Sequence, residues 1–201
     1  MDKGHTLALA RPPTRAFGVD PAPAVTVPLA TETHIFAQTS GSFFAERRLD
    51  ALLSGRCVKL AFIDGLHTFE QCLQDFIDLE RYCDEASVIV LHDTVPLTEA
   101  TQRRKQETDF WTGDVWKAVL ALRQYRPELD IFTIATAPTG LTVVIGLDPS
   151  SRALADAFDE AVARFMDLPF TEQDPRLTEA LGMVPNDWAL VSERLRARGV
   201  L

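Results

Sequence analysis

Two short apolar runs, each closed by acidic and histidine side chains, stand out in the pattern of hydrophobic and polar positions. The runs cover residues 58–63 and 88–91. Side chains that can hold protons or metal ions follow both of them, Asp64 and His67 after the first run and His92 and Asp93 after the second. Continuous apolar runs of this length are typical of strands buried on both faces of a parallel sheet.

The segment between the two runs has the pattern of an amphipathic helix. Thr68 and Gln71 have the spacing of a capping box. Apolar residues then recur at helical spacing, at Phe69, Cys72, Leu73, Phe76 and Ile77. The two strands of such a strand–helix–strand unit run parallel and end at the same edge of the sheet. We therefore expect the two acids and the two histidines to converge on one site.

The rest of the pattern predicts further strands and helices around this unit. Strands are expected near residues 15–19, 34–38, 131–136 and 141–146, and helices over Phe43 to Leu53, from Asp114 as N-cap to about Tyr125, from Leu154 to Phe165 and from Asp187 to Leu195. Because only residues 137–140 join the last two strands, these must pair antiparallel as a hairpin. The pattern therefore indicates an α/β protein with one late antiparallel strand and a helical C-terminal tail.

Composition and charge narrow the classes of function. The 201 residues fit one domain with a substantial core, and a formal net charge of −9 argues against a surface for nucleic acid or anionic membranes. No apolar run approaches the ~18 residues of a membrane span, and the N-terminal apolar stretch is too short for a signal peptide. The odd number of cysteines, without C-x-x-C spacing, favours a reduced, cytoplasmic protein.

Several motifs resemble methyltransferase family 24, within the class I S-adenosylmethionine-dependent methyltransferases. They are the F-I-D-G-L-H run at residues 62–67, the Asp75-Phe76 pair, the L-H-D-T run at 91–94, and the tracts 111–117 and 137–141. The resemblance covers roughly residues 4–149, and the family is similar to the metal-dependent O-methyltransferases. It implies a Rossmann-like sheet with a late antiparallel hairpin strand and helices on both faces. We expect a methyltransferase-like domain over residues 1–149 and a helical tail over 150–201 packed on the same domain.

The resemblance also implies cofactor-binding residues. Asp20 matches the acid that accepts hydrogen bonds from both ribose hydroxyls of S-adenosylmethionine, a task suited to an ionised carboxylate. Gly4 and Thr6 match the end of the glycine-rich loop that approaches the methionine part, and Ser42 is assigned to the same cofactor site. Because Gly4 stands so close to the start of the chain, we expect the first strand of the family to be absent.

The acids and histidines at the strand ends receive catalytic roles from the same resemblance. Asp64 and Asp93 match metal-ligating positions, and oxygen ligands suit Mg²⁺ or another divalent metal. His92 stands where related enzymes often carry another acid and is the third expected ligand. His67 is the expected general base, because an imidazole with a pKa near 6.5 can accept a hydroxyl proton. The implied reaction is methyl transfer to a hydroxyl of a small molecule, such as a sugar or secondary metabolite.

Purely structural roles for these residues stay open as well. Acids at strand ends often cap turns, and His67 can form local hydrogen bonds at a helix entry. Trp111 and Trp116 suit either contact with an acceptor or packing, and residues 103–105 suit either an anionic substrate or a solvated loop. The alternative function is an inactive methyltransferase-like scaffold; a phosphohydrolase built on the His-Asp pair fits less well, because that pair ends a strand. The sequence also leaves open whether the chain forms a homodimer.

Overall fold

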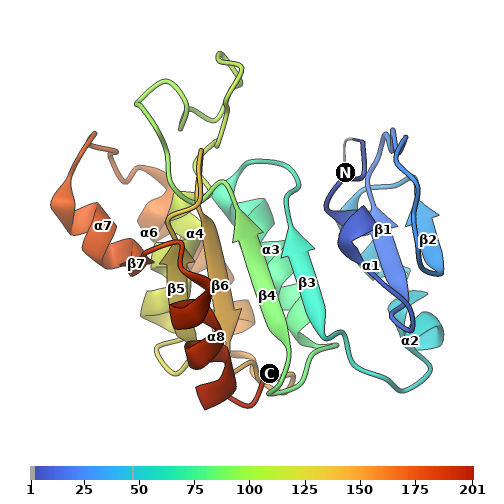
Figure 1. Cartoon of the computed structure of the whole chain (residues 1–201). Helices are drawn as coiled ribbons and strands as arrows, with labels where there is room; N and C mark the ends of the chain where they lie inside the picture. The colour runs from blue at the N-terminus through green and yellow to red at the C-terminus, as the bar shows by residue number, and fades with distance from the viewer. Residues whose placement is uncertain (1–2, 47) are drawn as a thin grey trace. The chain divides into compact units, whose positions relative to one another are not determined.

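The computed structural model describes residues 3–46 and 48–201, which form two compact units, Met1–Gly55 and Arg56–Leu201 (Figure 1). Each unit is built on a sheet of its own, one of two strands and one of five. The boundary expected at residue 149 falls within the second unit and separates the methyltransferase-like domain from its helical tail. This is a different division from the one at Gly55, and it stays a prediction. Among the described residues, no helix combines the length and the apolarity that crossing a bilayer requires.

The first unit holds a small parallel sheet and short helices. Strand β1 (Ala16–Val19) pairs in parallel with β2 (Thr33–Phe36), a 3-10 helix η1 (Leu7–Leu9) precedes them, and α1 (Ser40–Ala45) and α2 (Arg48–Leu53) follow. The single helix predicted from Phe43 to Leu53 is therefore wrong. The first helix starts earlier because the Thr39 side chain caps it, accepting a hydrogen bond from the backbone N–H of Ser42 at 3.2 Å.

The second unit is built on a mixed five-stranded sheet. Its strands are β3 (Leu60–Ile63), β4 (Val88–His92), β5 (Asp130–Ile134), β6 (Leu141–Ile145) and β7 (Met183–Val184), in the spatial order β3-β4-β6-β5-β7. The pairs β3–β4 and β5–β7 are parallel, and β6 runs antiparallel to both of its neighbours. The late hairpin predicted from the sequence is confirmed, whereas the short β7 was not expected.

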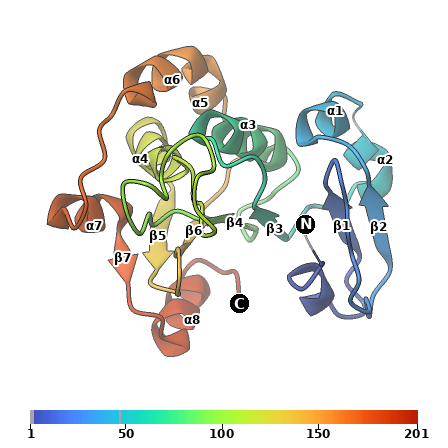
Figure 2. The same cartoon turned by 90° about the horizontal axis from the view of Figure 1, so that it is seen from above.

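Helices cover both faces of this sheet, as a Rossmann-like fold requires (Figures 1 and 2). On one face α3 (Phe69–Glu80) and α4 (Trp116–Tyr125) bury the main core, and α5 (Ala153–Asp156) and α6 (Phe158–Met166) pack on α4. On the other face, Val191 and Leu195 of α8 (Trp188–Ala197) pack on a separate apolar cluster. Alternating side chains of β4, β5 and β6 supply the two cores, because successive residues of a strand point to opposite faces. The edge strand β3 buries only Ala61 and Ile63, and its other face, with Leu60 and Phe62, is exposed.

The tail differs from its prediction in two places. The helix expected from Leu154 to Phe165 is divided into α5 and α6 at Ala157, whose φ of −100° and ψ of 10° leave the helical region. An unexpected helix, α7 (Pro175–Leu181), leads into β7. The last helix is confirmed: the side chain of Asp187 caps it by accepting a hydrogen bond from the N–H of Ala189 at 2.8 Å.

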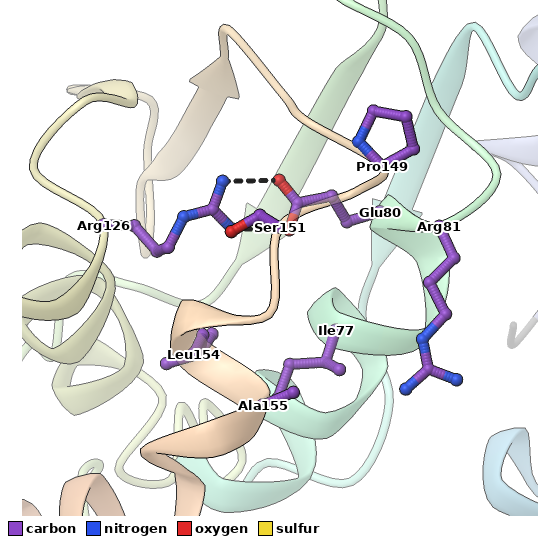
Figure 3. Close-up of a pocket in the computed structure, with 8 residues that line it drawn as sticks. All are labelled: Ile77, Glu80, Arg81, Arg126, Pro149, Ser151, Leu154 and Ala155. Carbon is purple, nitrogen blue, oxygen red and sulfur yellow. Dashed lines mark hydrogen bonds and ion pairs between the residues drawn. The ribbon is translucent and has the colours of Figure 1, made fainter.

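A buried ion pair joins α3 to α4 at their C-terminal ends. Arg126 is 1% exposed and binds Glu80 with both terminal nitrogens, at 2.6 and 3.0 Å (Figure 3). The same carboxylate accepts a hydrogen bond from the backbone N–H of Asp148, which follows β6. The pair therefore ties two helices and the chain after the hairpin together in a place where an unpaired charge is costly.

Removing the cation alone should destabilise the second unit strongly. We expect Arg126→Met to lower the free energy of unfolding by about 3–5 kcal/mol, because the buried Glu80 loses its cationic partner. Replacing Glu80 by Leu as well should restore most of this loss. Urea unfolding followed by tryptophan fluorescence measures it, since all three tryptophans lie in this unit.

The matched control is Arg152→Met, which breaks an exposed helical ion pair with Asp156. Such a pair is worth less than about 1 kcal/mol. Equal losses in Arg126→Met and in the double variant would contradict a penalty that comes from the unpaired carboxylate.

Candidate functional site

The parallel pairing of β3 and β4 brings four polar side chains together. Ile63 lies opposite Leu91, so the residues that follow them leave the sheet at the same edge. His67 Nε2 lies 3.4 Å from Asp64 Oδ1 and 3.3 Å from Asp93 Oδ2. His92 Nδ1 lies 3.3 and 2.9 Å from the same two oxygens. The two histidines and the two acids thus form one cluster, as the strand ends predicted.

The backbone at Asp93 turns sharply to place its carboxylate in the cluster. Its φ of +56° lies in the left-handed region, which L-residues rarely occupy and which costs about 1–2 kcal/mol. The residue is 7% exposed, whereas Asp64 across the cluster is exposed to solvent. Strained residues of this kind are frequent at functional sites, where the surrounding structure holds them in place.

The ring of His67 is oriented by the chain that follows β4. Its Nδ1 lies 2.7 Å from the carbonyl oxygen of Trp111, so Nδ1 carries the proton and donates it. The indole of Trp111 stacks on the imidazole with ring centroids 4.8 Å apart. Of the two possibilities left open for Trp111, the structure favours packing, here against a residue of the cluster. Nε2 of His67 is consequently the nitrogen that faces the carboxylates.

The cluster shifts the ionisation of its own members. The nearby carboxylates of Asp64 and Asp93 raise the pKa of His92 to about 10, against the opposing effect of burial. Burial by itself lowers the pKa of His67, but the same two acids and the Trp111 carbonyl outweigh it and raise that pKa. Burial would raise the pKa of Asp64, yet both histidines hold it well below its usual range. Without a bound cation the cluster therefore keeps His92 protonated near neutral pH and favours the protonated form of His67.

The donor set fits a divalent cation. Asp64, His67 and Asp93 each offer one donor atom, and these atoms lie within 4.8 Å of one another. Two carboxylate oxygens and an imidazole nitrogen are ligands that Mg²⁺, Mn²⁺ and similar ions accept. The sequence predicts His92 as a ligand and His67 as the general base, whereas the structure groups His67 with the two acids. The position of His67 depends on the Trp111 carbonyl, which no local pattern reveals; the ligand role of His92 stays a prediction.

The predicted cofactor residues all lie in the first unit. Asp20 directly follows β1 and accepts a hydrogen bond from the backbone N–H of Ala22 at 2.7 Å. Ser42 lies in α1, which follows β2, so it belongs to the same edge of the parallel pair as Asp20. Gly4 is buried against Val25, and Thr6 immediately precedes η1. Their roles in binding stay predictions.

Two of the three basic side chains at residues 103–105 are paired with acids rather than free for an anionic substrate. Arg104 pairs with Glu70 and Asp114, and Arg103 pairs with Glu99 and Glu107. The surface near the cluster is apolar instead: the ring centroid of Phe62 lies 5.7 Å from that of His92, and Leu66 is 63% exposed.

A protein-family model matches part of the chain. The model of methyltransferase family 24, described as a methyltransferase domain, matches residues 4–94. The matched segment begins at Gly4, includes Asp20 and Asp64 and ends directly after Asp93. No curated protein matches the chain.

The raised pKa of His92 predicts that stability depends on pH in the metal-free protein. Because the folded-state pKa is about 10 and the unfolded value is about 6.5, the contribution is complete below pH 6.5 and is lost as the pH rises to 10. His92→Gln should reduce this decline in the free energy of unfolding. Urea titrations with a chelator across that pH range measure the difference, with His34→Gln in the first unit as control. Parallel pH curves for His92→Gln and the parent protein would contradict the assignment.

Proposed function

We propose that this chain, whose residues 4–94 belong to the class I S-adenosylmethionine-dependent methyltransferase family, methylates a hydroxyl group of a small molecule with the help of a divalent cation. The observation that carries the proposal is the cluster of two acids and two histidines at the ends of β3 and β4. Its two carboxylates lie within 4.8 Å of each other, close enough to hold one cation between them, and His67 lies beside both. Methyl transfer is the general activity of the family; the hydroxyl target and the cation are inferred from this cluster.

The carboxylates of the cluster supply the negative charge that a cation needs. Asp64 and Asp93 would hold the ion from two sides, with His92 as a further ligand once its ring has lost a proton. When bound, such an ion polarises an acceptor hydroxyl and lowers its pKa. Asp93 is buried within its turn, whereas Asp64 is exposed to solvent, where an acceptor would reach the ion.

His67 is suited to take the proton of the acceptor. The Trp111 carbonyl holds Nδ1–H, which leaves Nε2 as the nitrogen that exchanges a proton within the cluster. The two carboxylates, 3.3 and 3.4 Å from Nε2, stabilise the imidazolium that results. His67 therefore acts at Nε2, and the Trp111 carbonyl fixes the tautomer that this role needs.

The cofactor residues follow from the family and from their place in the first unit. S-adenosylmethionine supplies a methyl group that is already activated by its sulfonium charge. Asp20 would accept hydrogen bonds from the ribose diol, and Gly4, Thr6 and Ser42 would line the rest of that half-site. Positioning then accounts for most of the rate acceleration, because the donor needs no further activation.

The surroundings of the cluster indicate the class of acceptor. Phe62 is 37% exposed and Leu66 is 63% exposed, so a sugar ring or the apolar face of a secondary metabolite can pack on them. The net charge of −9 fits neither nucleic acid nor an anionic membrane as the partner. The three cysteines are free thiols, which suits a reduced, cytoplasmic setting.

Calorimetric titration with S-adenosylhomocysteine tests the cofactor site directly. We expect binding in the micromolar range and at least about tenfold weaker binding in Asp20→Asn, because the lost hydrogen bonds are charge-assisted. Glu32→Gln, which removes another carboxylate of the same unit, should bind like the parent. Absence of binding by the folded parent protein would contradict the enzyme and favour the inactive scaffold.

Binding of Mn²⁺ tests the metal site independently of the cofactor. Asp64→Asn should weaken Mn²⁺ binding, measured by electron paramagnetic resonance, by at least about tenfold, since it removes a charged ligand. Asp159→Asn, an exposed acid on α6, is the matched control. Affinity in the parent protein should rise with pH, because the ion must displace protons from the histidines. Equal affinity in the parent and Asp64→Asn would contradict the assignment.

A further inference from the structure

We propose that Trp111–Asp114 is a positioning segment, which docks on the N-terminal end of α3 and fixes the imidazole of His67 for proton exchange at Nε2. The inference rests on the proposed function for the reason the ring must be fixed, but its evidence and its test need neither cofactor nor metal. Three separate contacts carry it, one from each of Trp111, Gly113 and Asp114.

Trp111 contacts the ring of His67 in two ways. Its carbonyl oxygen accepts the Nδ1 hydrogen bond at 2.7 Å, and its indole stacks on the imidazole at an interplanar angle of 28°. The indole is itself anchored, because Nε1 donates a hydrogen bond to the carbonyl oxygen of Arg103 at 2.6 Å. Together these contacts determine both the tilt of the ring and the nitrogen that carries the proton.

Gly113 brings the segment into direct contact with the backbone of His67. Its φ is +55°, and a Cβ atom at this position would lie 1.7 Å from the carbonyl oxygen of His67. No side chain fits in this space. The chain can approach so closely, and place Trp111 over the ring, only because residue 113 is a glycine.

Asp114 fastens the segment to the helix that begins after His67. Its Oδ1 accepts a hydrogen bond from the backbone N–H of Phe69 at 3.0 Å, a position that Thr68 does not fill with its own side chain. Its Oδ2 lies 2.9 Å from Arg104, which also bonds Glu70 on α3, and 3.5 Å from Lys117 on α4. The carboxylate is 1% exposed, so these charged contacts are shielded from solvent.

The three contacts act on consecutive parts of one short stretch. Trp111 contacts the ring of His67, and Gly113 lies against the carbonyl of the same residue. Asp114 accepts a hydrogen bond from the N–H of Phe69, two residues further along. Since the segment belongs to the chain after β4, it also links His67 to the strand that carries His92 and Asp93. The segment thereby connects the residues that follow β3 with the chain that follows β4.

Gly113→Ala tests the inference with a matched control. The added methyl must push the segment away from His67, whereas Gly199→Ala places the same strain, at a φ of +71°, where nothing lies within 4 Å. The readout is the Nδ1–H proton of His67 in ¹H–¹⁵N spectra of the metal-free protein. We expect its exchange with solvent to accelerate at least about fivefold in Gly113→Ala, the factor for one lost hydrogen bond, and to stay unchanged in Gly199→Ala.

A second pair of variants keeps the test valid if Gly113→Ala fails to fold. Arg104→Gln removes an exposed side chain that ties Asp114 to Glu70. Arg103→Gln is the control: it removes a neighbouring side chain that pairs with the surface acids Glu99 and Glu107, and it leaves the backbone carbonyl that anchors Trp111 in place. Faster exchange of the His67 proton in Arg104→Gln alone supports the inference. Unchanged exchange in both Gly113→Ala and Arg104→Gln overturns it.

Activity then separates this inference from the proposed function. If both hold, Gly113→Ala lowers kcat for methyl transfer and leaves the KM for S-adenosylmethionine unchanged, because the segment acts on the base. If the exchange effect is present but the parent protein transfers no methyl group, the positioning role stands and the proposed function fails.

Discussion

The parallel pairing of β3 with β4 is the constraint on which the rest of the second unit depends. Its register is held by apolar side chains, because Ala61 and Ile63 on one strand and Ile89 and Leu91 on the other all enter the core beneath α3. A slip by one residue would turn these side chains to the opposite face of the sheet. It would also separate Asp64 from Asp93, so the same packing that stabilises the sheet determines whether the cluster exists.

Features that depend on neighbouring residues could be predicted from the sequence. The period of the apolar residues located α3, and its predicted inward-facing members are all buried. The short connection between residues 136 and 141 required a hairpin, and β5 and β6 form it. The convergence of the acids and histidines followed from strand ends in one βαβ unit, which is a matter of topology and needs no knowledge of distant contacts.

Features that depend on residues far apart in the chain could not be predicted. Thr68 and Gln71 have a capping-box pattern, yet the cap of α3 comes from Asp114, which lies 45 residues away. Asp114 was in turn expected to cap α4, whose first turn has no side-chain cap. Both helices, α3 and α4, are predicted correctly. The predicted capping residues are wrong, because a carboxylate in a folded chain accepts a hydrogen bond from whichever N–H the tertiary structure brings to it.

The left-handed backbone at Asp93 has a consequence for which residues this position can accept. Glycine adopts this conformation freely, and asparagine and aspartate adopt it more readily than branched and bulky side chains do. Of these three, aspartate alone carries a negative charge. The turn and the chemistry therefore select the same amino acid by separate criteria. Asparagine at this position would preserve the turn without the charge, and glutamate would preserve the charge without the turn, so neither is a conservative replacement.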